Sequence, residues 1–120
     1  MDKPAAEIVT TKDLLLRIKA KHNLQSTYAL CKLMGENRRS IDRYLSGDTI
    51  KKASVMITVA RLLDADLSWV AYNIMAEEAE NDGEHDVARS FAETAQLYAT
   101  TGLAISACLC LFFSHLPPLF

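Results

Sequence analysis

The feature that most constrains this fold is a series of apolar stripes at helical spacing, each following a residue that can cap a helix. The candidate capping residues are Thr10 or Thr11, Ser26, Asn37 and Asp66. Asp13, three residues after Thr10, completes the sequence pattern of a capping box. Gly35, Gly47 and the cluster Asn81-Asp82-Gly83 supply turns between the helices. Because no alternating runs typical of strands intervene, the sequence predicts an all-α protein.

Each predicted helix carries a stripe of apolar residues that we expect to be buried. The stripes are Leu15, Leu16, Ile18 and Ala20; Ala29, Leu30, Leu33 and Met34; Ile41, Tyr44 and Leu45; Ala53, Met56, Ile57, Val59, Ala60 and Leu63; and Leu67, Val70, Ala71, Ile74 and Met75. The five helices within residues 10–81 are expected to enclose one core. A sixth, acidic amphipathic helix is expected over residues 84–98, with Val87, Ala88, Phe91, Ala92, Ala95 and Tyr98 as its stripe. Glu77, Glu78 and Glu80 are predicted to form a solvated helix face.

The charge of the chain is divided unequally between its two halves. The formal net charge is -2, but the part that ends at Arg61 carries +6 and the remainder carries -8. An asymmetry of this kind is typical of a protein with one half that faces a polyanion. The basic half is therefore a candidate for nucleic-acid binding.

The segment GENRRSIDRYLSG, residues 35–47, concentrates much of this positive charge. Its periodicity predicts that Ile41 and Tyr44 point into the core, and that four charged residues point outward: Arg38, Arg39, Asp42 and Arg43. The arginine fork matches the O6 and N7 acceptors of guanine. Asp42 would either orient a neighbouring arginine or accept a hydrogen bond from cytosine. The competing interpretation is that these arginines form the solvent-exposed surface of a helix and bind no partner.

The longer stretch STYALCKLMGENRRSIDRYLSG resembles the helix-turn-helix of the phage repressor and Cro-like (XRE-type) superfamily. Cys31 matches its small position, Gly35 its turn glycine, Asn37 its cap, Ile41 its buried β-branched position and Tyr44 its closing aromatic position. With the following LSG and RLLDADLSWV, the likeness covers about residues 10–81, which would form a five-helix DNA-binding domain. The whole plan is similar to an uncharacterised phage-related helix-turn-helix family with a hydrophobic C-terminal segment.

The resemblance implies that the third helix enters the major groove of double-stranded DNA. Two positions depart from the family pattern, since Glu36 replaces an apolar residue and Thr27 stands where a glutamine often touches the DNA backbone. The predicted base-contacting and phosphate-contacting residues are Ser26, Thr27, Asn37, Arg38, Arg39, Ser40, Asp42, Arg43, Lys51 and Lys52. One helix reads few base pairs, so a homodimer is expected. The implied function is a sequence-specific transcriptional regulator, of the phage or prophage repressor kind.

Residues 99–120 form a hydrophobic C-terminal segment that is much more apolar than the rest of the chain. Residues 99–116 carry no formal charge, and a membrane-spanning helix needs about 17 to 25 apolar residues. Gly102, Ser106 and Cys110 form a small-residue ridge that permits close helix approach. Against insertion, no Lys or Arg flanks the run. Two interpretations stay open: a membrane anchor, or a helix that packs on the core or in a dimer.

Other classes of function find little support in the sequence. No nucleophile stands beside a plausible base and no phosphate-cradling glycine loop occurs, so neither an enzyme nor a cofactor is expected. Cys108 and Cys110 lack a second ligand pair, so no metal site is expected. The segment MDKPAAEIVTTKD has no apolar signal-peptide core, which favours a cytoplasmic protein, tethered to the inner face of the membrane if the tail inserts. The alternative function is a small membrane-anchored interaction protein whose basic face meets an acidic protein surface.

Overall fold

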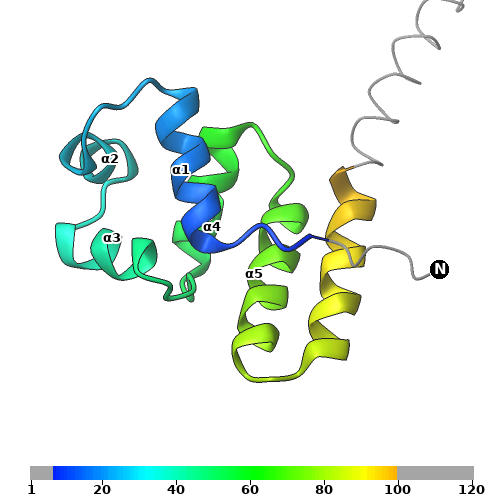
Figure 1. The fold of residues 1–120 in the computed structure, drawn as a ribbon. Helices are drawn as coiled ribbons and strands as arrows, with labels where there is room; N and C mark the ends of the chain where they lie inside the picture. Colours follow the sequence, from blue (N-terminus) through cyan, green and yellow to red (C-terminus); the bar gives the residue numbers. More distant parts are fainter. Residues whose placement is uncertain (1–6, 100–120) are drawn as a thin grey trace, which may run out of the picture.

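The computed structural model describes residues 7–99, and this part of the chain is helical without strands (Figure 1). The helices are α1 (Thr11–Lys21), α2 (Thr27–Met34), α3 (Arg38–Leu45), α4 (Ala53–Leu63) and α5 (Leu67–Asn81), followed by a helical segment over residues 85–99. The prediction of an all-α protein is therefore confirmed for the described residues. The hydrophobic C-terminal segment predicted over residues 99–120 lies outside them except for residue 99.

Four helices begin at a side-chain cap that the sequence predicted. Thr10 and Asp13 form a reciprocal capping box at the start of α1, with hydrogen bonds of 3.2 and 3.1 Å. Ser26, Asn37 and Asp66 accept a backbone N–H at the starts of α2, α3 and α5. Such a bond satisfies one of the backbone donors left free at a helix start. The helix boundaries are therefore fixed largely by local chemistry.

The core forms where α1 to α5 meet. Its largest fully buried side chains include Leu14, Leu15, Ile18, Leu30, Ile41, Ile50, Val55, Val59, Val70 and Ile74. In α1, the prediction was wrong for Leu16 and Ala20, which are exposed, and it omitted Leu14. Successive helical residues are about 100° apart, so three consecutive leucines cannot all face one core.

A similar shift of face occurs in α4 and α5. Ala53 and Ile57 were predicted to be buried but are exposed, Ile57 at 53%. Val59 and Ala60 are buried as predicted, together with Val55 and Leu62, which the prediction omitted. Leu67 and Met75 in α5 are also exposed, at 46% each. Apolar character was present on more than one face of these helices, and only packing selected which face is covered.

The helical segment 85–99 runs back alongside α5 (Figure 1). The seam contains small buried residues: Ala76, Ala79, Ala88, Ala92 and Ala95. At one end Tyr72 stacks on Tyr98 with ring centroids 5.5 Å apart, and it also lies 6.2 Å from Phe91. Val87, predicted to be buried, is 43% exposed. Among the helices of residues 7–99, none is both long and apolar enough to cross a bilayer.

Glu77 contradicts the prediction of a solvated acidic face, because its side chain is only 6% exposed. Its Oε1 accepts hydrogen bonds from the Thr11 backbone N–H at 2.9 Å and from Thr11 Oγ1 at 2.7 Å. Thr11 Oγ1 in turn accepts from the buried Ile50 N–H at 3.2 Å. Burial raises the pKa of Glu77, and the two bonds from Thr11 oppose that rise. This buried network ties α5 to the start of α1 and to the loop before α4.

Candidate nucleic-acid interface

Helix α3 has two chemically distinct faces, as the sequence predicted. Ile41 and Tyr44 are buried in the core, at 0% and 6% exposure. The opposite side consists of the exposed residues Arg38, Arg39, Asp42 and Arg43, which we call the outer face of α3. Burial raises the pKa of the Tyr44 hydroxyl, consistent with a side chain that packs in the core. The arginines therefore project from a helix that is anchored through its other side.

The turn between α2 and α3 is short and closely specified. Gly35 has a φ of 70°, in the left-handed region. The Gly35 N–H donates to Lys32 O and the Glu36 N–H donates to Cys31 O, at 3.3 and 3.1 Å. This pair of bonds is a Schellman motif, which satisfies carbonyls at the end of α2. Two residues later, Asn37 caps α3, so one helix stops and the next begins within three residues.

We expect Gly35→Ala to lower the free energy of unfolding by about 1–2 kcal/mol, the cost of left-handed backbone for a residue with a β-carbon. A β-carbon at this position would meet no other atom within 4 Å, so the cost arises from the backbone and not from a clash. Gly35→Asn is the matched control and should lose less, because asparagine tolerates this conformation. Urea denaturation measures both. An alanine variant as stable as the wild type would contradict this account of the turn.

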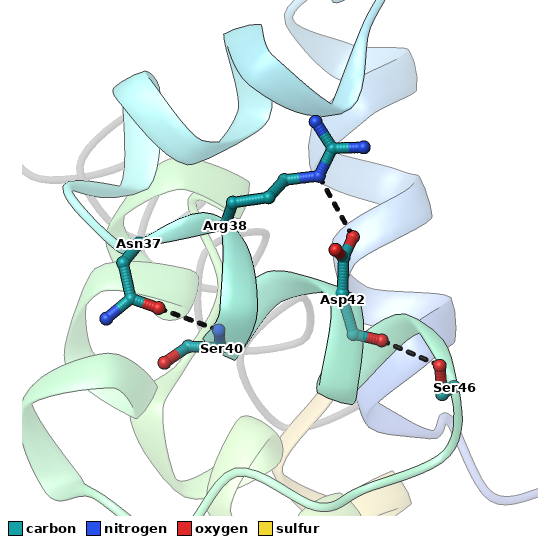
Figure 2. A network of polar contacts seen from close by, with 5 residues as sticks. All are labelled: Asn37, Arg38, Ser40, Asp42 and Ser46. Atoms are coloured by element: carbon teal, nitrogen blue, oxygen red, sulfur yellow. Dashed lines mark hydrogen bonds and ion pairs between the residues drawn. The ribbon is translucent and has the colours of Figure 1, made fainter.

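Asn37 uses its side-chain carbonyl within the protein. Its Oδ1 accepts the Ser40 N–H at 2.8 Å (Figure 2), while its amide nitrogen remains a donor for an external group. Ser40 itself is half-buried. At the other end of α3, Ser46 Oγ donates to the Asp42 backbone carbonyl at 2.8 Å. Both ends of α3 are thus held by short side-chain bonds.

One ion pair lies on the outer face of α3. Arg38 Nε donates to Asp42 Oδ1 at 3.1 Å, one helical turn apart, and the two side chains are 64% and 55% exposed. Arg39 and Arg43 are also one turn apart but carry like charges. Within residues 7–99 neither of them forms an ion pair with a carboxylate. Two arginines are therefore available to an anionic partner.

The predicted phosphate-contacting residues stand at two other helix starts. Ser26 caps α2 and its Oγ accepts the Ala29 N–H at 3.1 Å, and Thr27 opens that helix, half-buried. Lys51 and Lys52 are exposed and immediately precede α4. Helix α2 packs against both α3 and α4. All ten predicted residues are therefore exposed or half-buried. They lie on, or immediately before, three helices, of which α2 contacts both α3 and α4.

Sequence reasoning missed one surface feature beside this region. Tyr28 is 64% exposed, and Lys32 Nζ lies over its ring, 5.5 Å from the centroid. Together with Arg38 they line a shallow hollow along α2 and the turn. The spacing of Tyr28 and Lys32, four residues apart on a helix, was the signal that could have revealed the pair.

The described residues contain no cluster that suggests metal chemistry. Between residues 7 and 99, no group of three or more His, Cys, Asp or Glu side chains lies close enough to hold a metal ion. Comparison with known proteins adds no family assignment: no protein-family model, no curated protein and no solved structure matches the chain.

Proposed function

We propose that the protein is a sequence-specific DNA-binding transcriptional regulator of the phage or prophage repressor kind. In this proposal α2 and α3 act as a helix-turn-helix, with α3 as the recognition helix, and α1 to α5 form a repressor-like five-helix domain. The observation that carries the proposal is the outer face of α3, with three exposed arginines on a helix whose opposite face is buried. Arginine side chains on such a helix can hydrogen-bond base edges in the major groove.

The other predicted residues have a defined role in this proposal. The hydroxyls of Ser26 and Thr27 and the ammonium groups of Lys51 and Lys52 bind phosphates, which fixes the register of α3 on the duplex. The Asn37 amide nitrogen is a further donor beside the first base pairs. Phosphate contacts supply affinity that does not depend on sequence, whereas the arginines supply selectivity.

The proposed active form is a homodimer on two half-sites. A single helix contacts few base pairs, and a dimer doubles the sequence that is read. Sedimentation of the full-length protein at micromolar concentration, with and without a duplex, tests this part of the proposal. A mass of one chain per duplex would contradict it.

The direct test of the function is selection from a pool of duplexes with a randomised centre. The full-length protein should enrich one motif, and specific binding should be about 10³-fold or more tighter than binding to random duplex at physiological salt. Recovery of unbiased sequences would refute a sequence-specific regulator.

The uncharged run over residues 99–116 favours a second candidate function, a small membrane-anchored interaction protein. In that case the arginines of α3 would meet an acidic protein surface. Fractionation of cells that express the full chain, compared with a variant truncated after Tyr98, separates the two candidates. Membrane retention that depends on the segment, together with no duplex binding at low salt, would favour the second. Sequence-selective binding to a DNA duplex favours the transcriptional regulator, whether the protein is found in the membrane fraction or in the soluble fraction.

A further inference from the structure

The three arginines on the outer face of α3 have different surroundings. Arg38 Nε is bonded to Asp42 Oδ1 at 3.1 Å (Figure 2). Arg39 and Arg43 have no carboxylate partner among residues 7–99. One arginine of the set is therefore held by an ion pair before any ligand arrives, whereas the other two have no such partner among the described residues.

The bond to Asp42 uses only one edge of the Arg38 guanidinium. The group carries five N–H donors in a rigid plane. With Nε engaged, the two terminal nitrogens keep their four N–H groups, and they point away from Asp42 in Figure 2. Two adjacent donors in one plane match the O6 and N7 acceptors of guanine. The ion pair thus fixes the plane of the side chain and leaves its base-reading edge free.

The ion pair contributes little to the stability of the folded chain. Both side chains are more than half exposed, and exposed pairs of this spacing contribute little to the free energy of unfolding. A carboxylate on a surface that meets phosphates also weakens non-specific attraction. A gain in selectivity would offset that loss.

We infer that Asp42 is a positioning residue that orients Arg38 toward a guanine at one position of the operator, and that it thereby sets the specificity of that position. The inference rests on the proposed function and adds a specificity role for a side chain that does not itself need to touch a base. Arg38 enters the complex with less rotational freedom to lose, and exclusion of water strengthens its bond to Asp42. A base with a donor in place of O6, such as adenine, leaves one terminal nitrogen of Arg38 unpaired.

The test compares the full-length wild type with Asp42→Ala, Asp42→Glu and Asp48→Ala by selection from a duplex pool with a randomised centre. Asp42→Ala should lose roughly tenfold of the guanine preference at one motif position and keep the preferences elsewhere. Its affinity for random duplex should rise, because a negative charge is removed. Asp48 is exposed and not paired with Arg38, so Asp48→Ala makes the same charge change and should leave the motif intact. Asp42→Glu keeps a carboxylate one turn from Arg38 and should restore part of the preference.

Two further measurements separate positioning from a loss of folding. Arg38→Ala should lose the same motif position, and adding Asp42→Ala to it should cause no further loss there. In the free protein, the Arg38 Nε proton should exchange with water more slowly in the wild type than in Asp42→Ala. If the wild type and Asp42→Ala select the same motif, this inference is wrong but the proposed function still stands. A wild type that selects no motif would overturn both.

Discussion

Replacing Arg39 with alanine should abolish base preference at one or two positions of the selected motif, with a loss of discrimination of about tenfold or more. The side chain is exposed on α3 and has no carboxylate partner within residues 7–99, so it is available for a bidentate contact with guanine. The unfolding midpoint should change little, because exposed substitutions away from packed or bonded groups rarely alter stability. Fluorescence anisotropy with the selected duplex and single-base variants of it measures the discrimination.

Two matched variants distinguish base reading from charge. Arg39→Lys keeps the positive charge but lacks the planar fork, so it should keep the salt dependence of binding and still lose the preference. Lys51→Ala, by contrast, should weaken binding to all sequences alike and reduce the salt slope by about 1. If Arg39→Ala shows the same ratio of affinities for selected and random duplexes as the wild type, Arg39 does not read bases.

The largest loss of stability is expected from Thr11→Val, at about 3 kcal/mol of unfolding free energy. Valine has a similar shape but removes a donor to Glu77 Oε1 and the acceptor of the Ile50 N–H. Ile50 is 1% exposed, so its N–H would be left without a partner away from water. Thr11→Ser keeps the hydroxyl and should lose only the contribution of one methyl group, about 1 kcal/mol. Urea denaturation compares the three proteins, and equal losses for the two variants would contradict a role for the hydroxyl.

The same network predicts a dependence of stability on pH. Burial raises the folded-state pKa of Glu77, so the folded protein holds this proton more tightly than the unfolded chain. The contribution is fully present below the ordinary carboxyl pKa and is lost as pH rises through the raised value. Asp64, whose pKa is lowered mainly by its hydrogen bond from Lys21, contributes a slope of opposite sign.

Glu77→Gln isolates the Glu77 contribution, because glutamine can still accept from Thr11 but does not titrate. We expect the stability of the wild type relative to Glu77→Gln to fall as pH rises above the ordinary carboxyl pKa, and to level off once the pH exceeds the raised folded-state pKa. Urea denaturation of both proteins at each pH provides the difference. Parallel profiles for the two proteins would show that the Glu77 carboxyl titrates alike in the folded and unfolded chains.

For Asp42 at the candidate site, the sequence alone predicted the position of the side chain but not its partner. Helical periodicity placed it outward with the arginines and left two roles open, orientation of a neighbouring arginine or acceptance from cytosine. The structure pairs it with Arg38, at a spacing of one turn. The face of α3 was predictable because one buried stripe fixes the opposite side of the same helix. The choice of partner required side-chain geometry.

The sequence by itself determined where four of the five helices of residues 10–81 begin, because a cap such as Thr10 with Asp13 joins atoms only three residues apart. It did not determine which face of an ambiguous helix is covered, as the exposed Leu16 and Ile57 show. The burial of Glu77 was decided only by the tertiary structure, since its partner Thr11 lies 66 residues away. Helical spacing continues the stripe of Val70 and Ile74 to Glu77, but spacing alone does not show that a carboxylate there finds donors. A carboxylate can be buried only where distant backbone and hydroxyl donors converge on it, and that convergence is a property of the folded chain.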